Sequence, residues 1–387
     1  GCAGVVAGCF MLSYNRKVIF ESRLNLQVRA GFGALQYPEC LAGCARIEPE
    51  SAVAKQQDNP NIYWLKGFSI FLVVFGHFYA STFVVPGFDV ARRMVYLFHM
   101  PLFMAISGFL FELSPPLPLG ALLAKKFQRL LVPYLTLSAV IWGAKSIAAA
   151  LSFNLQRAIT SADWVAVALY PHHGFAVFLW YLYTLFVIFV LVGILQKFRV
   201  PLWAMGLLAL GARFMPLPRE FCLNLVGNHW IYFVLGMALS HVRRREGLFR
   251  HGLLTVGVAA AWSGFAVLAW LAITGSGRAV HWSELAASLA GILASWLTSV
   301  HPTLNRSLWL RRLGRTSASI YLLHTLVMGL TRYLWEVQIG TGSVWAQALF
   351  FVSAIGLGVY VPMRLQETFF ARLPWLSRLV LGTTVRK

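Results

Sequence analysis

The sequence has few charged residues, and this shortage excludes an ordinary soluble fold. Only 12% of its 387 residues are charged, against about a quarter in a soluble domain. Acidic residues are the scarcest, with 13 Asp and Glu against 33 Lys and Arg, so the formal net charge is +20. In a soluble protein this excess would indicate a nucleic acid partner. Here the basic residues fall in short segments between apolar runs, where they set topology, so we expect no nucleic acid partner.

Several patterns that carry function elsewhere are also missing. The chain has no internal repeat, no low-complexity tract and no Gly-rich nucleotide loop. Only Cys222 lies beyond residue 60, which excludes a disulfide framework, while Cys40 and Cys44 lack the second pair of ligands that a zinc site needs. We therefore expect no metal site.

Long apolar runs dominate what is there. Apolar residues make up 58% of the chain and aromatic residues 14%, as expected where rings line two membrane interfaces. Ten runs are long enough to be candidates for crossing about 30 Å of hydrocarbon. They lie at roughly 62–82, 92–112, 130–150, 175–196, 200–216, 225–241, 252–274, 282–300, 316–335 and 344–363. The predicted fold is an all-α, polytopic membrane helix bundle with about ten transmembrane helices.

The charge of the loops predicts the orientation of this bundle. An even number of spans places both termini on one side, and the loops of that side hold most of the Lys and Arg residues. By the positive-inside rule both termini are cytoplasmic. We expect residues 1–60 to form a poorly ordered N-terminal appendage, residues 61–365 the transmembrane domain and residues 366–387 a basic cytoplasmic tail.

Lys66 and His77 are separated by ten residues inside the first apolar run. On a helix these positions are almost three turns apart, so both side chains share one face and lie roughly 16 Å apart along the axis. Ionisable residues inside a membrane segment are costly and indicate a functional site. The alternative is that His77 merely makes a hydrogen bond between helices. Nearby Gly67 and Gly76, which allow close approach of another helix, favour the functional interpretation.

The second run contains His99 in the sequence Phe98-His-Met-Pro-Leu-Phe103. We expect His99 to lie at about the depth of His77. Pro101 removes a backbone hydrogen bond and Gly108 weakens a helix, so we expect a helix break that opens a cavity between the two histidines. The alternative is a proline kink with a satisfied histidine.

Basic residues gather at the start of the third run, where Lys125, Lys126 and Arg129 precede Pro133 and Tyr134. Such a group is commonly a topology determinant. It is equally suited to phosphates, which arginine binds with a bidentate fork and lysine as a point charge.

Three further polar clusters lie near the ends of other runs. In each of them we favour packing over catalysis. They are His172-His173 with Trp180 and Tyr181, then Asn228 with His229, and finally Tyr321 with His324, which are three positions apart on one helix face.

Taken in order, these pieces resemble the acyltransferase 3 family of bacterial membrane proteins, in its fucose 4-O-acetylase-like branch. The resemblance covers about residues 61–365. One departure is Lys66, where much of the family has arginine. The matching segments are Lys66 to His77, Phe98-His-Met-Pro-Leu-Phe103 with Ser107-Gly108, Lys126 and Arg129 to Pro133-Tyr134, Leu179-Trp-Tyr-Leu182, and Ile320-Tyr-Leu-Leu-His324.

The resemblance implies an acyltransferase in the bacterial inner membrane. It would move an acyl group, usually acetyl from acetyl-CoA, to a hydroxyl of a saccharide or lipid-linked glycan. The expected partners are then the lipid bilayer, acetyl-CoA as co-substrate and the glycan acceptor, with no bound cofactor.

The resemblance also suggests roles for individual residues. His77 would be the general base or the transient acyl acceptor, with His99 as a second catalytic residue. Donor binding would fall to Lys66, Lys126 and Arg129. Acceptor binding would fall to Trp180, Tyr181 and His324.

Two other classes of function fit a membrane bundle with buried polar residues. One is a secondary transporter or flippase for a glycan or an anion, because polar residues near the midplane also mark transport pathways. The other is a non-catalytic scaffold of an envelope assembly complex. The absence of repeated halves counts against the transporter.

Overall fold

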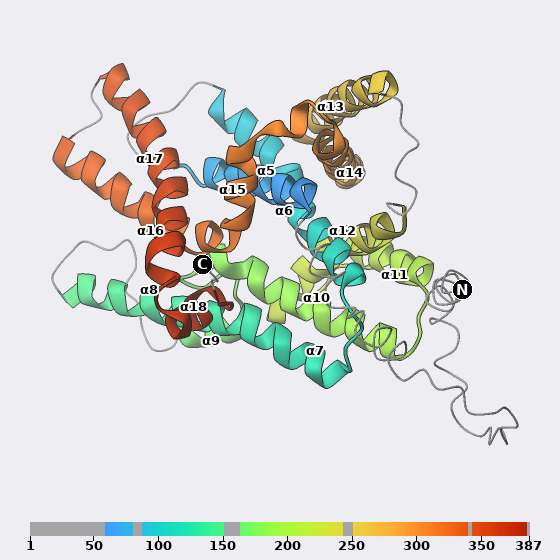
Figure 1. The fold of residues 1–387 in the computed structure, drawn as a ribbon, viewed down its shortest axis with the longest axis horizontal. Helices are drawn as coiled ribbons and strands as arrows, with labels where there is room; N and C mark the ends of the chain where they lie inside the picture. Colours follow the sequence, from blue (N-terminus) through green and yellow to red (C-terminus); the bar gives the residue numbers. More distant parts are fainter. Residues whose placement is uncertain (1–58, 80–86, 151–162, 243–250, 340–342, 385–387) are drawn as a thin grey trace, which may run out of the picture. The chain divides into compact units, whose positions relative to one another are not determined.

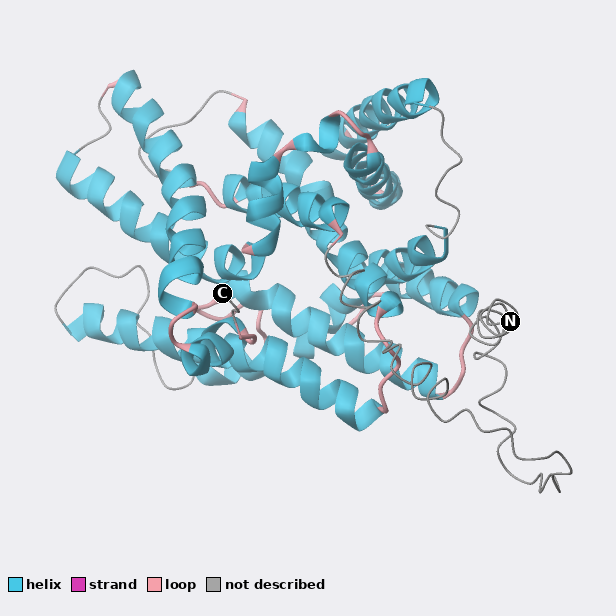
Figure 2. Cartoon of the chain, in the orientation of Figure 1, coloured by secondary structure: helices cyan, strands magenta, loops and turns pink. Residues whose placement is uncertain are grey.

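The computed structural model describes residues 59–79, 87–150, 163–242, 251–339 and 343–384. Within these ranges every regular element is a helix, as Figures 1 and 2 show. The all-helical class predicted from the apolar runs is therefore confirmed. The N-terminal appendage predicted for residues 1–60 lies, apart from its last two residues, outside the described ranges.

A helix occupies each of the ten predicted positions, with shorter helices between them (Figure 1). The α-helices are α5 Pro60–Gly76, α6 Phe88–Leu113, α7 Leu119–Lys126, α8 Val132–Ala150, α9 Asp163–Leu169, α10 Trp180–Lys197, α11 Leu202–Phe214, α12 Leu223–Val242, α13 His251–Thr274, α14 Arg278–Val300, α15 Leu308–Arg315, α16 Ser317–Leu334, α17 Val344–Leu365 and α18 Pro374–Leu381. The π-helices are η1 Phe127–Leu131, η6 Trp335–Ile339 and η7 Gln366–Phe370, and the 3-10 helices are η2 Val177–Leu179, η3 Glu220–Cys222 and η5 Leu304–Arg306.

Seven helical segments among the described residues are long and apolar enough to cross a membrane. They are Phe88–Leu113, Leu119–Ile147, Val177–Lys197, Glu220–His241, Gly252–Thr274, Ala279–Val300 and Val344–Phe370. The apolar helices α5 and α11 are shorter, at 17 and 13 residues, and α16 is not in this set. The chain is thus a multi-pass membrane protein, while ten spans and cytoplasmic termini stay predictions.

The first helix ends earlier than its apolar run. Asn59 caps the start of α5 by accepting a hydrogen bond from the Asn61 N–H at 2.9 Å, and Pro60 opens the helix. The helix ends at Gly76, so the predicted end at residue 82 is wrong. His77 is the residue that caps the C-terminus of α5 rather than a residue in its interior.

Pro101 does not break α6, which runs continuously from Phe88 to Leu113. The break expected from the sequence is therefore wrong. Proline deprives the carbonyl four residues earlier, that of Leu97, of its helical hydrogen bond. The Ser288 hydroxyl of α14 donates to this carbonyl at 2.5 Å, so a neighbouring helix satisfies the group that the proline leaves unpaired.

Glycines bring α6 and α12 into backbone contact. A Cβ atom on Gly108 would lie 1.9 Å from the Phe233 carbonyl oxygen, and one on Gly236 would lie 1.9 Å from that of Ala105. The role of Gly108 in the structure is therefore to let the two helix backbones approach closely.

A second glycine crossing joins α5 to α15. A Cβ atom on Gly67 would meet the Leu310 carbonyl oxygen at 1.8 Å, and one on Gly314 would meet that of Tyr63 at 1.8 Å. Arg312 of α15 in turn makes a two-point ion pair with Glu367 of η7, at 2.8 and 2.6 Å. These contacts fix the position of α5, which carries both Lys66 and His77.

We expect Gly314→Leu to lower the yield and thermal stability of the folded protein, because the new side chain would overlap a backbone carbonyl that has no rotamer to adopt. Overpacking of this kind costs about 1 to 3 kcal/mol. The measurement is size-exclusion chromatography of detergent-solubilised protein after heating. Gly143→Leu in α8 is the matched control, since a Cβ there has no atom within 4 Å. Equal melting of both variants would contradict the close crossing.

Candidate active site

His77 is held by its own helix. Its backbone N–H donates to the carbonyls of Val73 and Val74, and its ring Nδ1 lies 2.8 Å from the Val73 carbonyl oxygen. A carbonyl only accepts hydrogen bonds, so Nδ1 carries the hydrogen and, in the neutral ring, Nε2 carries the lone pair. The free lone pair is the chemical requirement for a general base or an acyl acceptor.

His324 of α16 is the imidazole that lies against His77. The two ring centroids are 4.9 Å apart, and the rings meet edge to face at 78°. His324 is fully buried, and its Nδ1 donates to the carbonyls of Ile320 and Tyr321 at 2.9 and 2.8 Å. Its Nε2 is buried without a hydrogen-bond partner among the described residues. The pair therefore presents two imidazoles with the same tautomer.

A tyrosine ring, that of Tyr96, lies between His99 and His77. The Tyr96 ring lies 6.3 Å from the His77 ring and 5.0 Å from the His99 ring, and its hydroxyl donates to the Gly76 carbonyl at 3.2 Å. The His99 Nδ1 donates to the Val95 carbonyl at 2.7 Å, which leaves its buried Nε2 without a partner in the described part of the chain. The structure thus brings three histidines together. His324 contacts His77 directly, and the Tyr96 ring separates His99 from His77.

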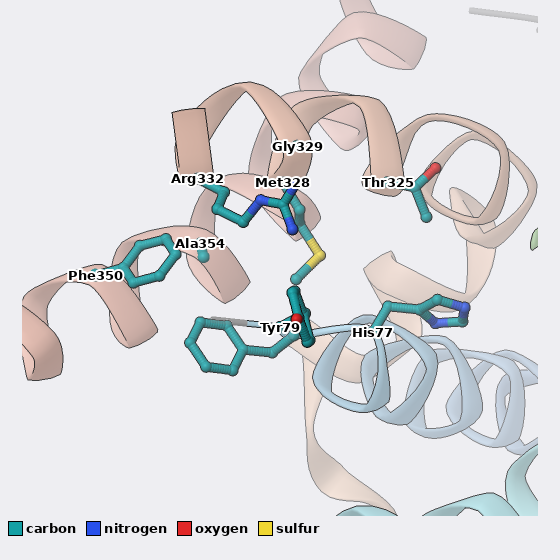
Figure 3. A pocket seen from close by; sticks show the side chains of 9 residues that line it. His77, Tyr79, Thr325, Met328, Gly329, Arg332, Phe350 and Ala354 are labelled. Carbon is teal, nitrogen blue, oxygen red and sulfur yellow. The ribbon is translucent and has the colours of Figure 1, made fainter. Parts of the chain in front are cut away.

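A cavity of about 210 Å³ opens beside His77, between the end of α5 and helices α16 and α17 (Figure 3). Its lining combines one cation with aromatic and apolar side chains. Figure 3 shows His77 at one end and Arg332 with Phe350 towards the other. The lining residues are His77, Phe78, Tyr79, Thr325, Met328, Gly329, Arg332, Phe350 and Ala354.

The predicted donor-binding cations lie away from this cavity. The Lys66 ammonium lies 5.8 Å from the Tyr63 ring centre, over which Arg315 also lies at 5.3 Å. The Lys126 ammonium lies 3.5 Å from the Phe189 ring centre, a cation–π contact. Tyr63 is the residue whose carbonyl touches Gly314, so Lys66 and Arg315 mark the end of α5 opposite to His77.

Arg129 connects the two lysines electrostatically. Its positive charge acts on both Lys66 and Lys126, which places the three predicted cations in one field. None of the three forms an ion pair with a carboxylate within the described ranges. A group of cations that repel one another and lack local counter-charges is suited to a ligand with several negative charges.

Tyr181 and Trp180, predicted to bind the acceptor, belong to an aromatic row on another side of His324. Tyr321 lies 6.3 Å from His324 and 5.5 Å from Tyr181, whose hydroxyl is 3.1 Å from the Ser107 hydroxyl. Trp180 then lies 5.1 Å from His229, which also donates its Nδ1–H to a carbonyl of its own helix, at 2.9 Å. Tyr181 is buried, whereas Trp180 is half-buried beside the exposed His172.

Sequence reasoning singled out His324 but did not place it against His77, and it missed Tyr79, Tyr96 and Arg332. A signal existed for the cavity wall: Thr325, Met328, Gly329 and Arg332 follow the spacing of one helix face. No such signal existed for Tyr79, which follows the end of α5.

Comparison with known proteins gives a family for this arrangement. A family model described as an acyltransferase domain matches residues 59–363, and every site residue named above lies in that range. The match covers most of the chain and includes both the histidine pair and the three cations.

Nodulation protein NolL of Mesorhizobium japonicum is similar over a shorter stretch. The two proteins are 29% identical over 166 residues, which make up 39% of this chain and 40% of NolL. The chain thus spans about two fifths of the length of this curated relative. No solved structure matches the chain.

Proposed function

The chain belongs to the acyltransferase 3 family, and from this premise we propose that it moves an acetyl group from acetyl-CoA to a hydroxyl of a cell-envelope saccharide or lipid-linked glycan. It is a multi-pass membrane acyltransferase, and its proposed location is the bacterial inner membrane. The observation that supports the proposal most directly is the His77–His324 pair, which lies between a group of cations and a cavity. Family membership favours acyl transfer over the transporter and the scaffold.

His77 supplies the base in this proposal. The acceptor oxygen attacks the thioester carbonyl carbon and gives its proton to Nε2 of His77, while the carbon–sulfur bond breaks and the thiolate of coenzyme A leaves. The Nδ1–H bond to Val73 keeps the lone pair on Nε2 and fixes the plane of the ring. In a two-step alternative the same lone pair first takes the acetyl group and then passes it to the hydroxyl. Both routes need Nε2 to be free.

The phosphates of coenzyme A are proposed to bind Lys66, Lys126 and Arg129. Lys66 and His77 are about 16 Å apart along α5, a gap that the long arm of coenzyme A would bridge with its thioester at the histidine end. The arginine fork suits a phosphate, and the cation–π contact holds the Lys126 ammonium in place while its hydrogens remain available.

The acceptor side is proposed to include His324, Tyr181 and Trp180. His324 touches the proposed base directly. The Tyr181 hydroxyl lies within hydrogen-bond distance of Ser107, so we assign Tyr181 a positioning role in the row that supports His324. Trp180 is half-buried and retains an accessible ring face for stacking on a sugar. His99 is proposed to support the base from behind Tyr96.

We expect His77→Ala to abolish acetyl transfer and to leave the amount of inserted protein unchanged, because the Nε2 lone pair proposed to take the proton is lost with the ring. The measurement is the O-acetyl content of envelope glycans, isolated from cells that contain matched amounts of the protein. His281→Ala is the control, since His281 is an exposed residue of α14. Activity near that of the unaltered protein would remove His77 from the site, and loss of inserted protein would give it a packing role.

Lys66 tests the donor side. We expect Lys66→Arg to keep substantial activity and Lys66→Met to lose most of it, because a positive charge near the phosphates is the requirement. Losing a charged contact costs about 1.5 to 3 kcal/mol, or roughly tenfold or more in acetyl-CoA affinity. Steady-state kinetics that vary each substrate in turn measure this loss, with Lys197→Met, at an exposed lysine of α10, as control. A defect confined to the acceptor would move Lys66 to the other substrate.

A further inference from the structure

We propose that the cavity beside His77 binds an acidic group of the acceptor, a carboxylate or a phosphate, through Arg332. The inference rests on the proposed function, and it names the class of acceptor: a saccharide that carries a negative charge close to the hydroxyl that becomes acetylated.

The cavity has the position and size for part of a saccharide. It begins at His77, the proposed base, and it is lined by residues of α16 and α17 (Figure 3). Its volume of about 210 Å³ is below the roughly 300 to 1,000 Å³ of pockets that hold drug-sized ligands. It therefore suits a single sugar unit rather than a length of polymer.

Arg332 makes no side-chain hydrogen bond within the described part of the chain. It forms a long ion pair with Glu336, whose Oε2 lies 3.9 Å from the arginine Nε, beyond hydrogen-bond distance, so the Nη1 and Nη2 groups stay available. Its guanidinium carbon lies 5.5 Å from the centre of the Tyr79 ring, a cation–π contact that orients the group without using its N–H donors. Figure 3 shows the guanidinium directed towards Tyr79 across the cavity. A guanidinium held in this way presents its fork to an oxyanion.

The cation of this cavity is at the opposite end of the site from the cations proposed for the donor. Along α5 and the residues that follow it the order is Tyr63, His77 and Tyr79. Their contacts in α15 and α16 are Arg315, His324 and Arg332, in the same order. From Arg315 onwards, through α16, the chain therefore runs beside α5 in the same direction. Lys66 and Arg315 lie at one end, Arg332 at the other, and the histidine pair between them. Phosphates of coenzyme A bound at Lys66 leave Arg332 to the acceptor.

A simpler interpretation is that Arg332 only balances the helix dipole at the end of α16. The helical path does not end there, because η6 continues it from Trp335 to Ile339. Nor does a dipole effect account for a cavity that joins Arg332 to His77. Since Arg332 is about 12 Å beyond His324 along α16, the acidic group belongs to the acetylated unit or to its neighbour.

The first experiment compares envelope glycans from native cells with and without the gene, and locates by mass spectrometry the sugar that loses its O-acetyl group. We expect this sugar to be acidic itself, or to be adjacent to a unit that carries a carboxylate or a phosphate. An acetylated neutral sugar with no acidic neighbour would overturn the inference and leave the proposed function intact. Unchanged glycan acetylation would contradict the proposed function itself, and the inference with it. Uronate and phosphate are distinguished in the same spectra.

The second experiment tests the residue. We expect Arg332→Gln to lower glycan O-acetylation about tenfold or more at matched protein level, and Arg332→Lys to lower it less, because lysine keeps the charge and loses the fork. Acetyl-CoA affinity, titrated on purified protein in detergent, should be unchanged in both variants. The control is Arg93→Gln, an exposed arginine of α6 outside the cavity lining. Weaker acetyl-CoA binding, or full glycan acetylation in Arg332→Gln, would overturn the inference.

Discussion

The hydrogen bond from a histidine Nδ1 to a carbonyl of its own helix governs this site. A polar group within a membrane bundle must find a partner inside the protein. His77, His99, His229 and His324 each meet half of this requirement locally, by donating Nδ1–H to the carbonyl four residues earlier. The other half is left open at His99 and His324, whose buried Nε2 atoms have no hydrogen-bond partner among the described residues. In all four rings the Nδ1–H bond fixes the tautomer and keeps the lone pair on Nε2, which is what a base or an acyl acceptor needs.

Helix crossings decide which of these open nitrogens come together. Glycines at Gly67 and Gly314 let α5 lie on the backbone of α15, and α16 follows α15 directly in the chain. His324 is thereby carried to the end of α5, where His77 is. On the other side, Ser288 satisfies the carbonyl that Pro101 leaves free, and α6 continues unbroken through the turn that carries Tyr96 and His99. Packing of small residues, rather than attraction between polar ones, assembles the site.

The features that could be predicted from the sequence are those that depend on a single helix. The apolar runs located the helices, and the ten residues between Lys66 and His77 placed a cation and a histidine on one of them. The sequence could not predict contacts between helices, since no periodic pattern records which helices are neighbours. Hence His99 was expected beside His77, whereas the nearest ring is that of His324. The effect of Pro101 was misjudged for the same reason, because the hydroxyl that compensates for it lies on α14.

The distribution of charge along α5 and α16 gives the site a direction. Lys66 is about 16 Å from His77 along α5, and Arg332 is about 12 Å beyond His324 along α16, so the histidine pair lies between two cationic ends. A cation at the end of an apolar path is less costly than one midway, because a long basic side chain there can extend to an interface. Histidine suits the middle of such a path, since its ring is neutral in the resting state and is charged only after it has taken up a proton. The order of lysine, histidine and arginine along the path is thus the least costly one in an apolar surrounding, and the chemistry proposed for each residue agrees with its place in that order.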